Sequence, residues 1–315
     1  MELTEDALIE AIRRVVSGAA EGVLVGPGDD AAVVAPGAGE LVLTTDVLVE
    51  GVHFHGDLTT ARDLGFKAVA VNLSDVAAMA ASPRFALCAL TLSDEVDAAW
   101  VMELAGGMRE CCDEFAVSLV GGNIARGRDV TIAVTLTGEV APGRAVRRNG
   151  ARPGDRVVVT GSLGGAAAGR RLAAERSWTD DERDALRRQV RPTPRVGEAG
   201  VLATNGARAM IDVSDGLALD LSRLCAASAV GVRLDLSALP RHPVATDEEV
   251  LGGGEDYELL ATLPDGPAVS GARAQLSEAF GVPLAEIGRI IEGELVAVDG
   301  GEERPLEPEG WDHLR

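Results

Sequence analysis

Two series of strand-like and helix-like segments, separated by a stretch rich in Arg, Gly and Pro, limit the folds open to this chain. The stretch covers residues 142–155 and contains the run G-R-A-V-R-R-N-G-A-R-P-G-D, which favours a junction over a helix or strand. Hydrophobic periodicity before the junction predicts helices and strands over 7–16, 41–46, 61–81, 85–92, 95–115, 116–120 and 130–140. After it, the same patterns predict elements over 156–160, 161–172, 207–211, 217–229, 232–236 and 257–263. We therefore predict an α/β (α+β) chain of two domains, residues 1–141 and 142–315.

The charge of the chain excludes two classes of partner. Its 315 residues include 50 Asp and Glu against 29 Lys and Arg, which gives a formal net charge of -21. Nucleic acids and anionic membranes attract basic surfaces, so we expect neither as a partner. A protein this acidic can bind a polyphosphate only where metal ions or backbone dipoles reverse the local sign of the charge.

Several common signatures are missing from the sequence. Lys67 is the only lysine, and the residues before it do not form the G-x-x-x-x-G-K-[ST] motif of a P-loop. The H-R-D and D-F-G signatures of protein kinases are missing as well. The four cysteines form no C-x-x-C pair, and the acidic start Met1–Asp6 is unlike a signal peptide. Because no run of eighteen apolar residues occurs either, we expect a cytoplasmic protein with reduced thiols.

The first half of the chain carries aspartates in places that a solvated surface explains poorly. Asp29 and Asp30 lie between a glycine and an apolar run, so each would need a partner or a metal ion if both faced the core. A simple Gly-Asp turn is the alternative. Thr44, Thr45 and Asp46 end an apolar strand. Their hydroxyl and carboxylate oxygens are hard ligands of the kind that Mg²⁺ prefers.

A second pair of polar residues lies within the predicted helix 61–81. Asn72 and Asp75 are three residues apart, which places them on one face of an otherwise apolar helix. The small residues around them would let a ligand or another backbone come close. If the helix instead began near Ser74, then Ser74 and Asp75 would serve only as its cap.

The second half repeats the pattern of acids at the ends of apolar segments. Asp212 ends the predicted strand 207–211, and Ser214 and Asp215 are expected at N-cap positions of the helix 217–229. Glu255 follows three glycines, which would allow close approach to a ligand, although a bulged turn is the alternative. Together with the acids of the first half, these residues predict a site with several Mg²⁺ ions in a cleft between two domains, holding a polyphosphate.

In order along the chain, these segments resemble the thiamine-monophosphate kinase family, within the superfamily that includes aminoimidazole ribonucleotide synthetase. The resemblance covers about residues 24–314. It rests on G-P-G-D-D-A-A-V, T-T-D-V-L-V-E-G-V-H-F, K-A-V-A-V-N-L-S-D-V-A-A-M, the junction run, I-D-V-S-D-G-L, G-G-E-D-Y-E-L and the terminal G-W-D-H-L. The V-E-G-V-H-F and G-W-D-H-L pieces favour this family over its relatives.

The resemblance implies a fold, a reaction and a set of site residues. It implies an N-terminal ATP- and magnesium-binding domain whose sheet pairs with a second subunit in a homodimer, and a C-terminal domain that completes the site. The implied substrates are ATP and thiamine monophosphate. The implied Mg²⁺ ligands are Asp30, Thr44, Thr45, Asp46, Asp75, Asn123, Asp212 and Asp215. The implied contacts to ATP are Gly122, Asn123, Arg148 and Ser214, and those to thiamine monophosphate are His53, Glu255 and Trp311. Trp311 would also offer an aromatic face to the thiazolium cation, whereas without the family it is equally explained as a packed anchor of the chain end.

One position departs from the family pattern. After Gly121 and Gly122 the family usually has Asp, itself a metal ligand, followed by T-T-R-G, whereas this chain has Asn123-Ile-Ala-Arg-Gly. An amide oxygen can bind Mg²⁺ but brings no charge. We expect one metal ion to be bound more weakly here, which leaves reduced activity or an altered substrate open.

Because the acceptor is itself a phosphate, we expect no protein nucleophile and no general base. Catalysis would consist of aligning two anions and neutralising their charge with Mg²⁺ and Arg148. Three alternatives stay open: an ATP-dependent ligase or cyclase of the same superfamily, a weakened nucleotide-binding relative, and a calcium-binding structural protein. The last lacks a D-x-D-x-D-G loop.

Overall fold

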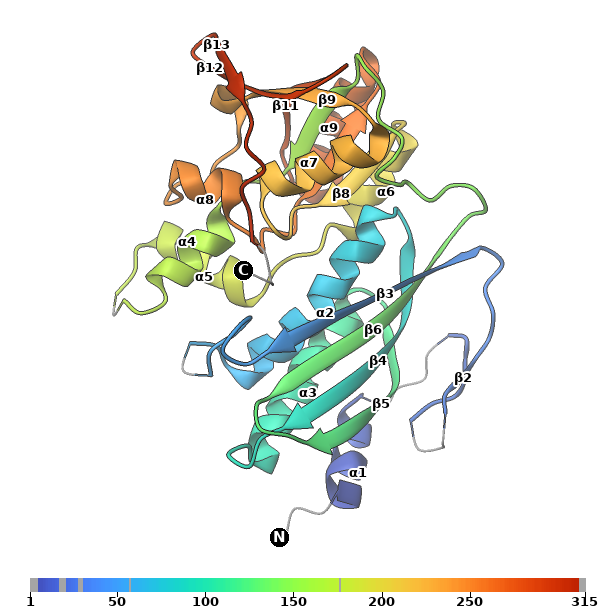
Figure 1. Cartoon of the computed structure of the whole chain (residues 1–315). Helices are drawn as coiled ribbons and strands as arrows, with labels where there is room; N and C mark the ends of the chain where they lie inside the picture. The colour runs from blue at the N-terminus through green and yellow to red at the C-terminus, as the bar shows by residue number, and fades with distance from the viewer. Residues whose placement is uncertain (1–4, 17–20, 28–30, 57, 176, 312–315) are drawn as a thin grey trace. The chain divides into compact units, whose positions relative to one another are not determined.

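The computed structural model describes residues 5–16, 21–27, 31–56, 58–175 and 177–311. They form two compact units, which are described separately. Unit 1 is drawn from Met1–Val76 and Ser82–Gly143, and unit 2 from Ala77–Ala81 and Arg144–Arg315. Both units combine helices with a β-sheet (Figure 1). The prediction of two α/β domains is therefore confirmed.

A four-stranded sheet forms the centre of unit 1. Its strands lie in the order β3 (Glu40–Val49), β6 (Thr131–Val140), β4 (Ser82–Leu92) and β5 (Ser118–Arg126). β6 is antiparallel to both of its neighbours, whereas β4 and β5 are parallel to each other. A separate short pair consists of β1 (Val23–Val25) and β2 (Val33–Val34).

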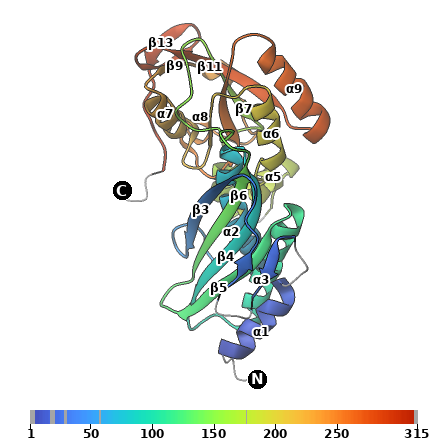
Figure 2. The same ribbon diagram turned by 90° about the vertical axis from the view of Figure 1, so that its right-hand side faces the viewer.

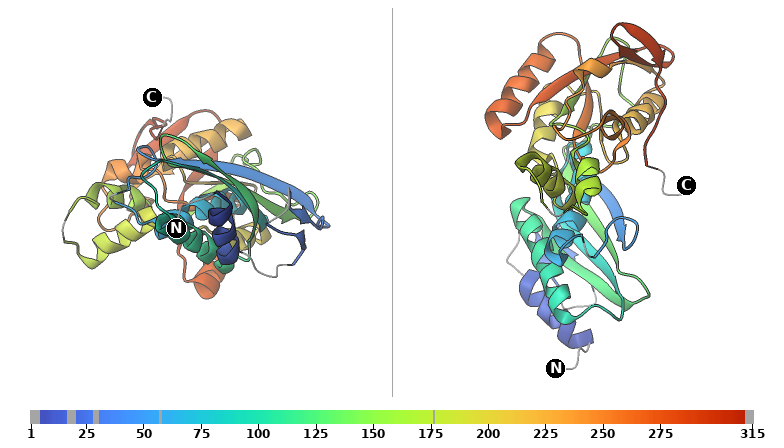
Figure 3. Two further views of the ribbon diagram at one scale, coloured as in Figure 1. Left: turned by 90° about the horizontal axis from the view of Figure 1, so that it is seen from below. Right: turned by 90° about the vertical axis from the view of Figure 1, so that its left-hand side faces the viewer.

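Helices α2 (Ala61–Ala78) and α3 (Ala98–Glu114) cover one face of this sheet, and α1 (Glu5–Val16) lies beside α3 (Figures 2 and 3). Most residues of α2 are buried all round the helix. That burial explains why this helix shows no clear amphipathic pattern in the sequence. Gly107 of α3 permits a close approach of the two helices, because a Cβ there would lie 1.8 Å from the carbonyl oxygen of Arg62.

A seven-stranded, mostly antiparallel sheet forms the centre of unit 2. Its strands lie in the order β13 (Glu302–Pro305), β12 (Leu295–Asp299), β9 (Gly231–Asp235), β11 (Leu284–Ile291), β7 (Arg156–Thr160), β10 (Leu259–Leu263) and β8 (Ala209–Asp212). The helices of this unit are α4 (Gly165–Leu172), α5 (Asp180–Val190), α6 (Val196–Thr204), α7 (Leu217–Ser228), α8 (Asp247–Gly252) and α9 (Pro267–Phe280), with a 3₁₀ turn at Leu236–Ala238.

Helices cover both faces of the unit 2 sheet. On β7, Val157 belongs to a buried cluster with Leu221 of α7, whereas Val158 belongs to another with Leu202 of α6 and Leu276 of α9. Successive side chains of a strand face opposite sides of a sheet, so α7 covers one face and α6 and α9 cover the other (Figure 2). Burial on both faces accounts for the continuous apolar run of β7.

The structure also contains elements that the sequence analysis does not assign. These are β1, β2, α5, α6, α8 and every element after residue 263. In α9 only Val269, Ala272 and Leu276 are buried, and the small residues between them weaken the helical pattern. The strand predicted over 116–120 does not end at the glycines, because β5 continues through them to Arg126. Within the described part of the chain, no helix combines the length and apolar character needed to cross a membrane.

Candidate active site

In unit 1 the first predicted residues meet between β3 and α2. The Thr44 hydroxyl donates a 2.5 Å hydrogen bond to Oδ2 of Asp75, and the backbone N–H of Asp46 donates to Oδ1 of Asn72 over 3.0 Å. Asn72 is buried and its amide group also donates to the Ala68 carbonyl oxygen. The prediction that Asn72 and Asp75 share one helix face is confirmed. Because α2 begins at Ala61, the alternative of a cap near residue 74 is wrong.

Thr45 lies on the opposite face of the same strand. Its hydroxyl donates to the Val134 carbonyl oxygen and accepts a hydrogen bond from the Thr135 hydroxyl, both over 3.1 Å. The alternation of a β-strand explains this, because Thr44 and Asp46 face α2 and the residue between them faces away. The structure therefore does not bring the Thr45 side chain to Asp75.

His53 lies in the turn that follows β3. Its Nδ1 accepts the backbone N–H of Val49 over 3.1 Å, and its own backbone N–H donates to the Val49 carbonyl oxygen over 2.9 Å. A neutral imidazole that accepts at one nitrogen carries its proton on the other. This turn therefore fixes the ring with Nε2 as the donor, which suits a contact to an anion.

Gly122 and Asn123 lie on β5, the edge strand farthest from β3. Gly122 is in the same row of the sheet as Asp46, through Val134 of β6 and Cys88 of β4. Three spacings of about 4.8 Å separate the outer two strands, or roughly 14 Å. The structure thus does not place Asn123 against the Thr44–Asp75 pair of its own unit. Gly122 is also a steric requirement, because a Cβ there would lie 2.0 Å from the Cys88 carbonyl oxygen.

In unit 2 three segments are joined by backbone hydrogen bonds. Asp212 ends β8 and is only 2% exposed. Beyond it, the Ser214 carbonyl oxygen accepts the Glu255 N–H over 2.7 Å, and the Asp215 carbonyl oxygen accepts the Trp311 N–H over 2.8 Å. Four of the predicted residues are thereby held in one place: Ser214, Asp215, Glu255 and Trp311.

The prediction that Ser214 and Asp215 cap α7 is wrong. The N-cap is Gly216, and no side chain caps the helix from that position. Instead Asp220, which lies inside α7 and is fully buried, turns its carboxylate back onto the loop. Its Oδ2 accepts the backbone N–H groups of Ser214, Asp215 and Gly216 over 3.1, 3.0 and 3.2 Å.

One arginine joins two carboxylates at this loop. A terminal nitrogen of Arg223 donates to Oδ2 of Asp215 over 2.5 Å and to Oδ1 of Asp220 over 2.7 Å. Burial raises the pKa of Asp220, while the Asp215 N–H and the Arg223 guanidinium act in the opposite direction. The loop is therefore a negatively charged segment held by an internal cation.

Two further acids, Asp256 and Glu258, hold the segment that carries Glu255. Glu255 and Tyr257 have φ values of 70° and 51°, which are uncommon for residues with side chains and mark a constrained loop. Between them, Asp256 accepts the backbone N–H groups of Gly164 and Ala166 at the start of α4 over 2.6 and 3.2 Å. Burial raises the pKa of the Asp256 carboxyl to about 7.

Glu258 completes this support from within the core of unit 2. It is 1% exposed and accepts two hydrogen bonds of 2.7 and 2.6 Å from the guanidinium of Arg195. It also accepts the Thr160 hydroxyl over 2.6 Å. Paired in this way, the buried charge of Glu258 is compensated.

Trp311 and Arg148 differ in their surroundings. The Trp311 ring is 44% exposed, and the guanidinium carbon of Arg170 lies 5.9 Å from its centroid. Arg148 is exposed, and its carbonyl oxygen accepts the hydroxyl of Ser228 at the end of α7. Since Asp215 lies before the start of α7, the structure places the Arg148 backbone at the opposite end of that helix from the loop.

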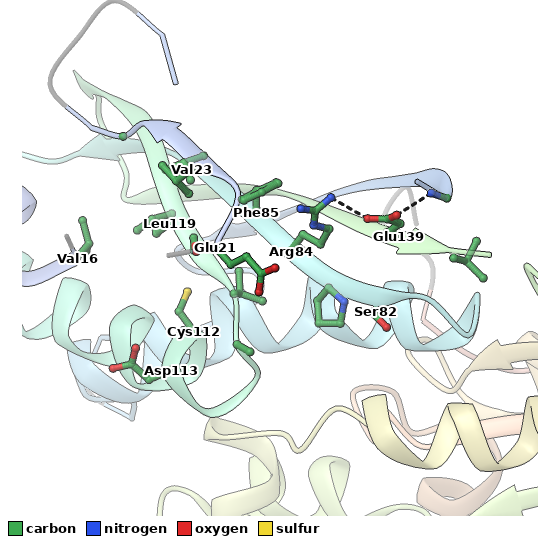
Figure 4. Close-up of a pocket in the computed structure, with 18 of the residues that line it drawn as sticks. Val16, Glu21, Val23, Ser82, Arg84, Phe85, Cys112, Asp113, Leu119 and Glu139 are labelled. Carbon is green, nitrogen blue, oxygen red and sulfur yellow. Dashed lines mark hydrogen bonds and ion pairs between the residues drawn. The ribbon is translucent and has the colours of Figure 1, made fainter. Parts of the chain in front are cut away.

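Asp30 and the pocket of unit 1 add no described residue to the candidate site. Asp30 lies outside the described residues. A pocket of about 1250 Å³ in unit 1 is lined by neither the Thr44–Asp75 pair nor any other predicted residue that the structure describes. Its rim holds Arg84, which donates to Glu139 over 2.7 Å (Figure 4). The Gly39 N–H and Arg84 hold the pKa of Glu139 below its ordinary value. Arg84 and Glu139 are thus engaged with each other, and Glu139 also with the backbone.

Comparison with known proteins assigns the chain to a family. Residues 28–140 match the AIR synthase related protein, N-terminal domain, and residues 152–300 match the corresponding C-terminal domain. The chain is 40% identical to the thiamine-monophosphate kinase of Escherichia coli K12 over 307 residues, which are 93% of this chain and 92% of that protein. The chain belongs to the thiamine-monophosphate kinase family.

Solved structures of this kinase family agree with the assignment. The crystal structure of thiamine-monophosphate kinase from Stenotrophomonas maltophilia K279a has a TM-score of 0.84 and 37% identity, and covers 96% of this chain and 98% of that one. The structure of AaThiL complexed with AMPPCP and TMP has a TM-score of 0.76 and 33% identity, and covers 99% of this chain and 97% of that one. The predictions of an enzyme and of this kinase family are confirmed.

The donor atoms in both units suit the metal ion that we expect for this kinase family. Among the described residues, no three His, Cys, Asp or Glu side chains are grouped closely enough to hold a metal ion. Mg²⁺ does not need such a cage, since one or two carboxylates with phosphate and water oxygens suffice. Asp46 and Asp75, with the Thr44 hydroxyl, supply such oxygens in unit 1, and Asp212 and Asp215 supply them in unit 2. The residues present therefore fit Mg²⁺.

Sequence reasoning did not find the supporting role of three residues of this kinase: Asp220, Asp256 and Glu258. A signal existed for the first. Asp220 lies beside Leu217, Leu221 and Leu224 on the buried stripe of α7, and an acid on an apolar helix face requires a partner. For the other two, the sequence shows acids after a glycine run but not the direction in which each side chain points.

Proposed function

We propose that this chain transfers the γ-phosphoryl group of ATP directly to the phosphate of thiamine monophosphate, giving thiamine diphosphate and ADP. The observation that carries the proposal is the near full-length similarity to AaThiL, which was solved with AMPPCP and TMP. In AMPPCP a methylene group replaces the oxygen that bridges the β- and γ-phosphorus atoms of ATP, so AMPPCP stands in for ATP without being cleaved. AMPPCP and TMP together therefore represent both substrates of one transfer.

The proposed chemistry needs no protein nucleophile. A phosphate oxygen of the acceptor attacks the γ-phosphorus, and the bond from that phosphorus to the β–γ bridging oxygen breaks as ADP leaves. The acceptor oxygen is already ionised, so no base has to remove a proton. Burial raises the pKa of Cys88, Cys112 and Cys225 to about 12, which keeps these thiols protonated at neutral pH. Direct transfer in line is the simplest mechanism compatible with these residues.

We assign the site residues to three tasks. Mg²⁺, when bound, neutralises the charge that develops on the phosphates. The residues that would hold it are Asp30, Thr44, Thr45, Asp46, Asp75, Asn123, Asp212 and Asp215. The residues proposed to contact ATP are Gly122, Asn123, Arg148 and Ser214. The residues proposed to contact thiamine monophosphate are His53, Glu255 and Trp311. Thr45 would take part through its backbone, since its side chain faces away from Asp75.

We also propose that the chain forms a homodimer through the unit 1 sheet. The face away from α2 exposes apolar side chains of β3 and β4, namely Leu41 (64%), Leu43 (64%), Val47 (45%) and Leu87 (45%). A sheet face that exposes several large apolar side chains is typical of an interface. A monomeric mass in solution, measured by light scattering, would contradict this part of the proposal.

The experiment that tests the function is a phosphotransfer assay with two charge-removing variants. We expect thiamine diphosphate to form from ATP and thiamine monophosphate only with Mg²⁺ present. Asp75→Asn and Asp212→Asn should each lower kcat roughly 10³-fold, because each removes one charge beside the transferred group. Asp113→Asn, on exposed α3 surface, is the matched control and should keep its rate.

The outcomes separate the alternatives. Near-normal rates in both Asp75→Asn and Asp212→Asn would contradict the proposed metal ligands. Tight AMPPCP binding without any product would instead favour a weakened nucleotide-binding relative, for which Asn123 is the motivating feature. ATP cleavage with another acceptor, but none with thiamine monophosphate, would favour a ligase or cyclase of the superfamily.

A further inference from the structure

The loop between β8 and α7 has an internal partner for each of its backbone N–H and carbonyl groups. Three consecutive N–H groups, of Ser214, Asp215 and Gly216, converge on one oxygen of Asp220. Consecutive N–H groups that converge in this way usually form a cradle for an anion such as phosphate. Here the cradle is filled by a carboxylate of the same chain, so the backbone of this loop has no N–H group to offer to a phosphate.

The consequence is a loop that can meet a phosphate only through its side chains. With its N–H groups engaged, the loop presents the Ser214 hydroxyl and the Asp215 carboxylate. The Asp215 carboxylate is in turn held by Arg223, which binds Asp220 through the same nitrogen. Arg223 is 40% exposed, whereas Asp220 is fully buried. The backbone and the carboxylate are therefore fixed by two different residues.

We propose that Asp220 and Arg223 are positioning residues for nucleotide binding: Asp220 fixes the backbone of residues 214–216, and Arg223 fixes the Asp215 carboxylate. This inference rests on the proposed function, because it takes Ser214 and Asp215 as contacts to ATP and Mg²⁺. The proposal gives neither residue a direct contact with the substrates. Asp220 acts through its three hydrogen bonds to the loop backbone, and Arg223 acts through its hydrogen bonds to Asp215 and Asp220.

A buried carboxylate elsewhere in unit 2 provides a matched control. Asp155 is 2% exposed, accepts the Arg152 N–H over 2.9 Å and forms a 2.6 Å ion pair with Arg208. It lies in the turn before β7, away from the loop. Asp155→Asn and Asp220→Asn thus remove the same charge from similar surroundings, and only the second touches residues 214–216.

The test measures loop order and nucleotide binding separately. Amide hydrogen exchange of residues 214–216 is recorded in metal-free protein, and AMPPCP binding is measured by calorimetry over a range of Mg²⁺ concentrations. For Asp220→Asn and Asp220→Ala we expect exchange to be faster, and the Kd for AMPPCP with Mg²⁺ to rise, by roughly tenfold or more. For Arg223→Gln we expect a several-fold higher Mg²⁺ requirement and a smaller rise in exchange than in the Asp220 variants, because Asp220 loses an ion-pair partner but keeps its three hydrogen bonds to the loop. Asp155→Asn should change neither quantity.

Each outcome decides the inference. Faster exchange in the Asp220 variants without weaker AMPPCP binding would overturn it, since Asp220 would then serve only the stability of α7. If both Asp220 variants fail to fold, the inference depends on Arg223→Gln, and an unchanged Mg²⁺ requirement there would overturn it. If wild type itself does not bind AMPPCP, the proposed function fails, which is a different result from intact binding in the variants.

Discussion

The two groups of candidate site residues are built in different ways. In unit 1, Thr44 and Asp75 belong to a strand and a helix, and they meet through a direct side-chain hydrogen bond. In unit 2, Ser214, Glu255 and Trp311 lie on irregular segments joined by backbone hydrogen bonds. The first group is placed by the periodicity of regular elements. The second depends on whatever holds the loops.

What holds the loops of unit 2 is buried charge. Asp220 and Glu258 are at most 1% exposed, and each has an arginine partner. In unit 1 the corresponding support is Asn72, a neutral side chain that hydrogen-bonds across α2 and β3. Loss of one partner of a buried ion pair lowers the free energy of unfolding far more than loss of a neutral or exposed hydrogen-bond partner, because a desolvated charge is left behind. The unit 2 group should therefore be the more fragile.

The largest expected effect is on the stability of unit 2. Glu258→Gln would leave the largely buried Arg195 guanidinium opposite a neutral amide, and Glu198 would be its remaining acidic partner among the described residues. We expect a loss of about 3–5 kcal/mol in the free energy of unfolding. Urea denaturation followed by circular dichroism measures it.

The control for this prediction is an exposed ion pair of unit 1. Asp113 is 58% exposed and pairs with Arg109 four residues earlier on α3. Asp113→Asn should cost about 0–1 kcal/mol. If Glu258→Gln is no more damaging than Asp113→Asn, buried charge does not distinguish the two units, and the comparison breaks down.

The same contrast decides how much the sequence could predict. The shared helix face of Asn72 and Asp75 was predicted from their three-residue spacing. That strand alternation brings Thr44 and not Thr45 to them was not predicted. Asp212 was placed correctly at the end of β8, whereas the prediction of Asp215 as an N-cap of α7 is wrong. Asp220 instead accepts the backbone hydrogen bonds that a capping side chain would have accepted. No spacing rule predicts that an acid inside a helix folds back onto the loop before it.

Elements without a strong pattern were predicted least well. The sequence assigned nothing after residue 263, although β11, β12 and α9 follow. The short strand β12 is recognisable through its pairing with β9 and β13, and β13 through its pairing with β12. Pairing is a tertiary property, which composition does not encode.

A second prediction concerns the pH dependence of the Asp256 support. Its pKa is raised from 3.8 to about 7 by burial, so the folded state keeps the proton where the unfolded chain has lost it. The resulting stabilisation is complete below pH 4 and is lost as the pH rises to 7. Asp256→Asn stays neutral throughout. The stability of wild type relative to this variant should fall by about 3 kcal/mol between pH 5 and pH 8.

Urea denaturation of both proteins at pH 5 and pH 8 measures this difference. Using the difference cancels the titration of all other groups, including Asp184, whose several arginine and histidine partners lower its pKa. A constant difference between the two proteins would show that Asp256 has the same charge state folded and unfolded. The loop of Glu255 would then not depend on a neutral acid.

The smallest effect is expected for a substitution in unit 1, Asn123→Asp. Asn123 is exposed on the edge strand β5, where a substitution meets little packing, so Asn123→Asp should leave stability nearly unchanged. If this residue contacts a metal ion, the added charge should lower the Mg²⁺ concentration for half-maximal activity by roughly threefold to tenfold, since ligand charge sets the affinity of such sites. Ala125→Asp is the matched control, because Ala125 is exposed two residues along on the same face of the strand. An equal response to both variants would reflect the general field of an added acid. Only a response specific to position 123 would place a metal ion there. It would also show that a regular strand, unlike the loops of unit 2, tolerates a new charge without a buried partner.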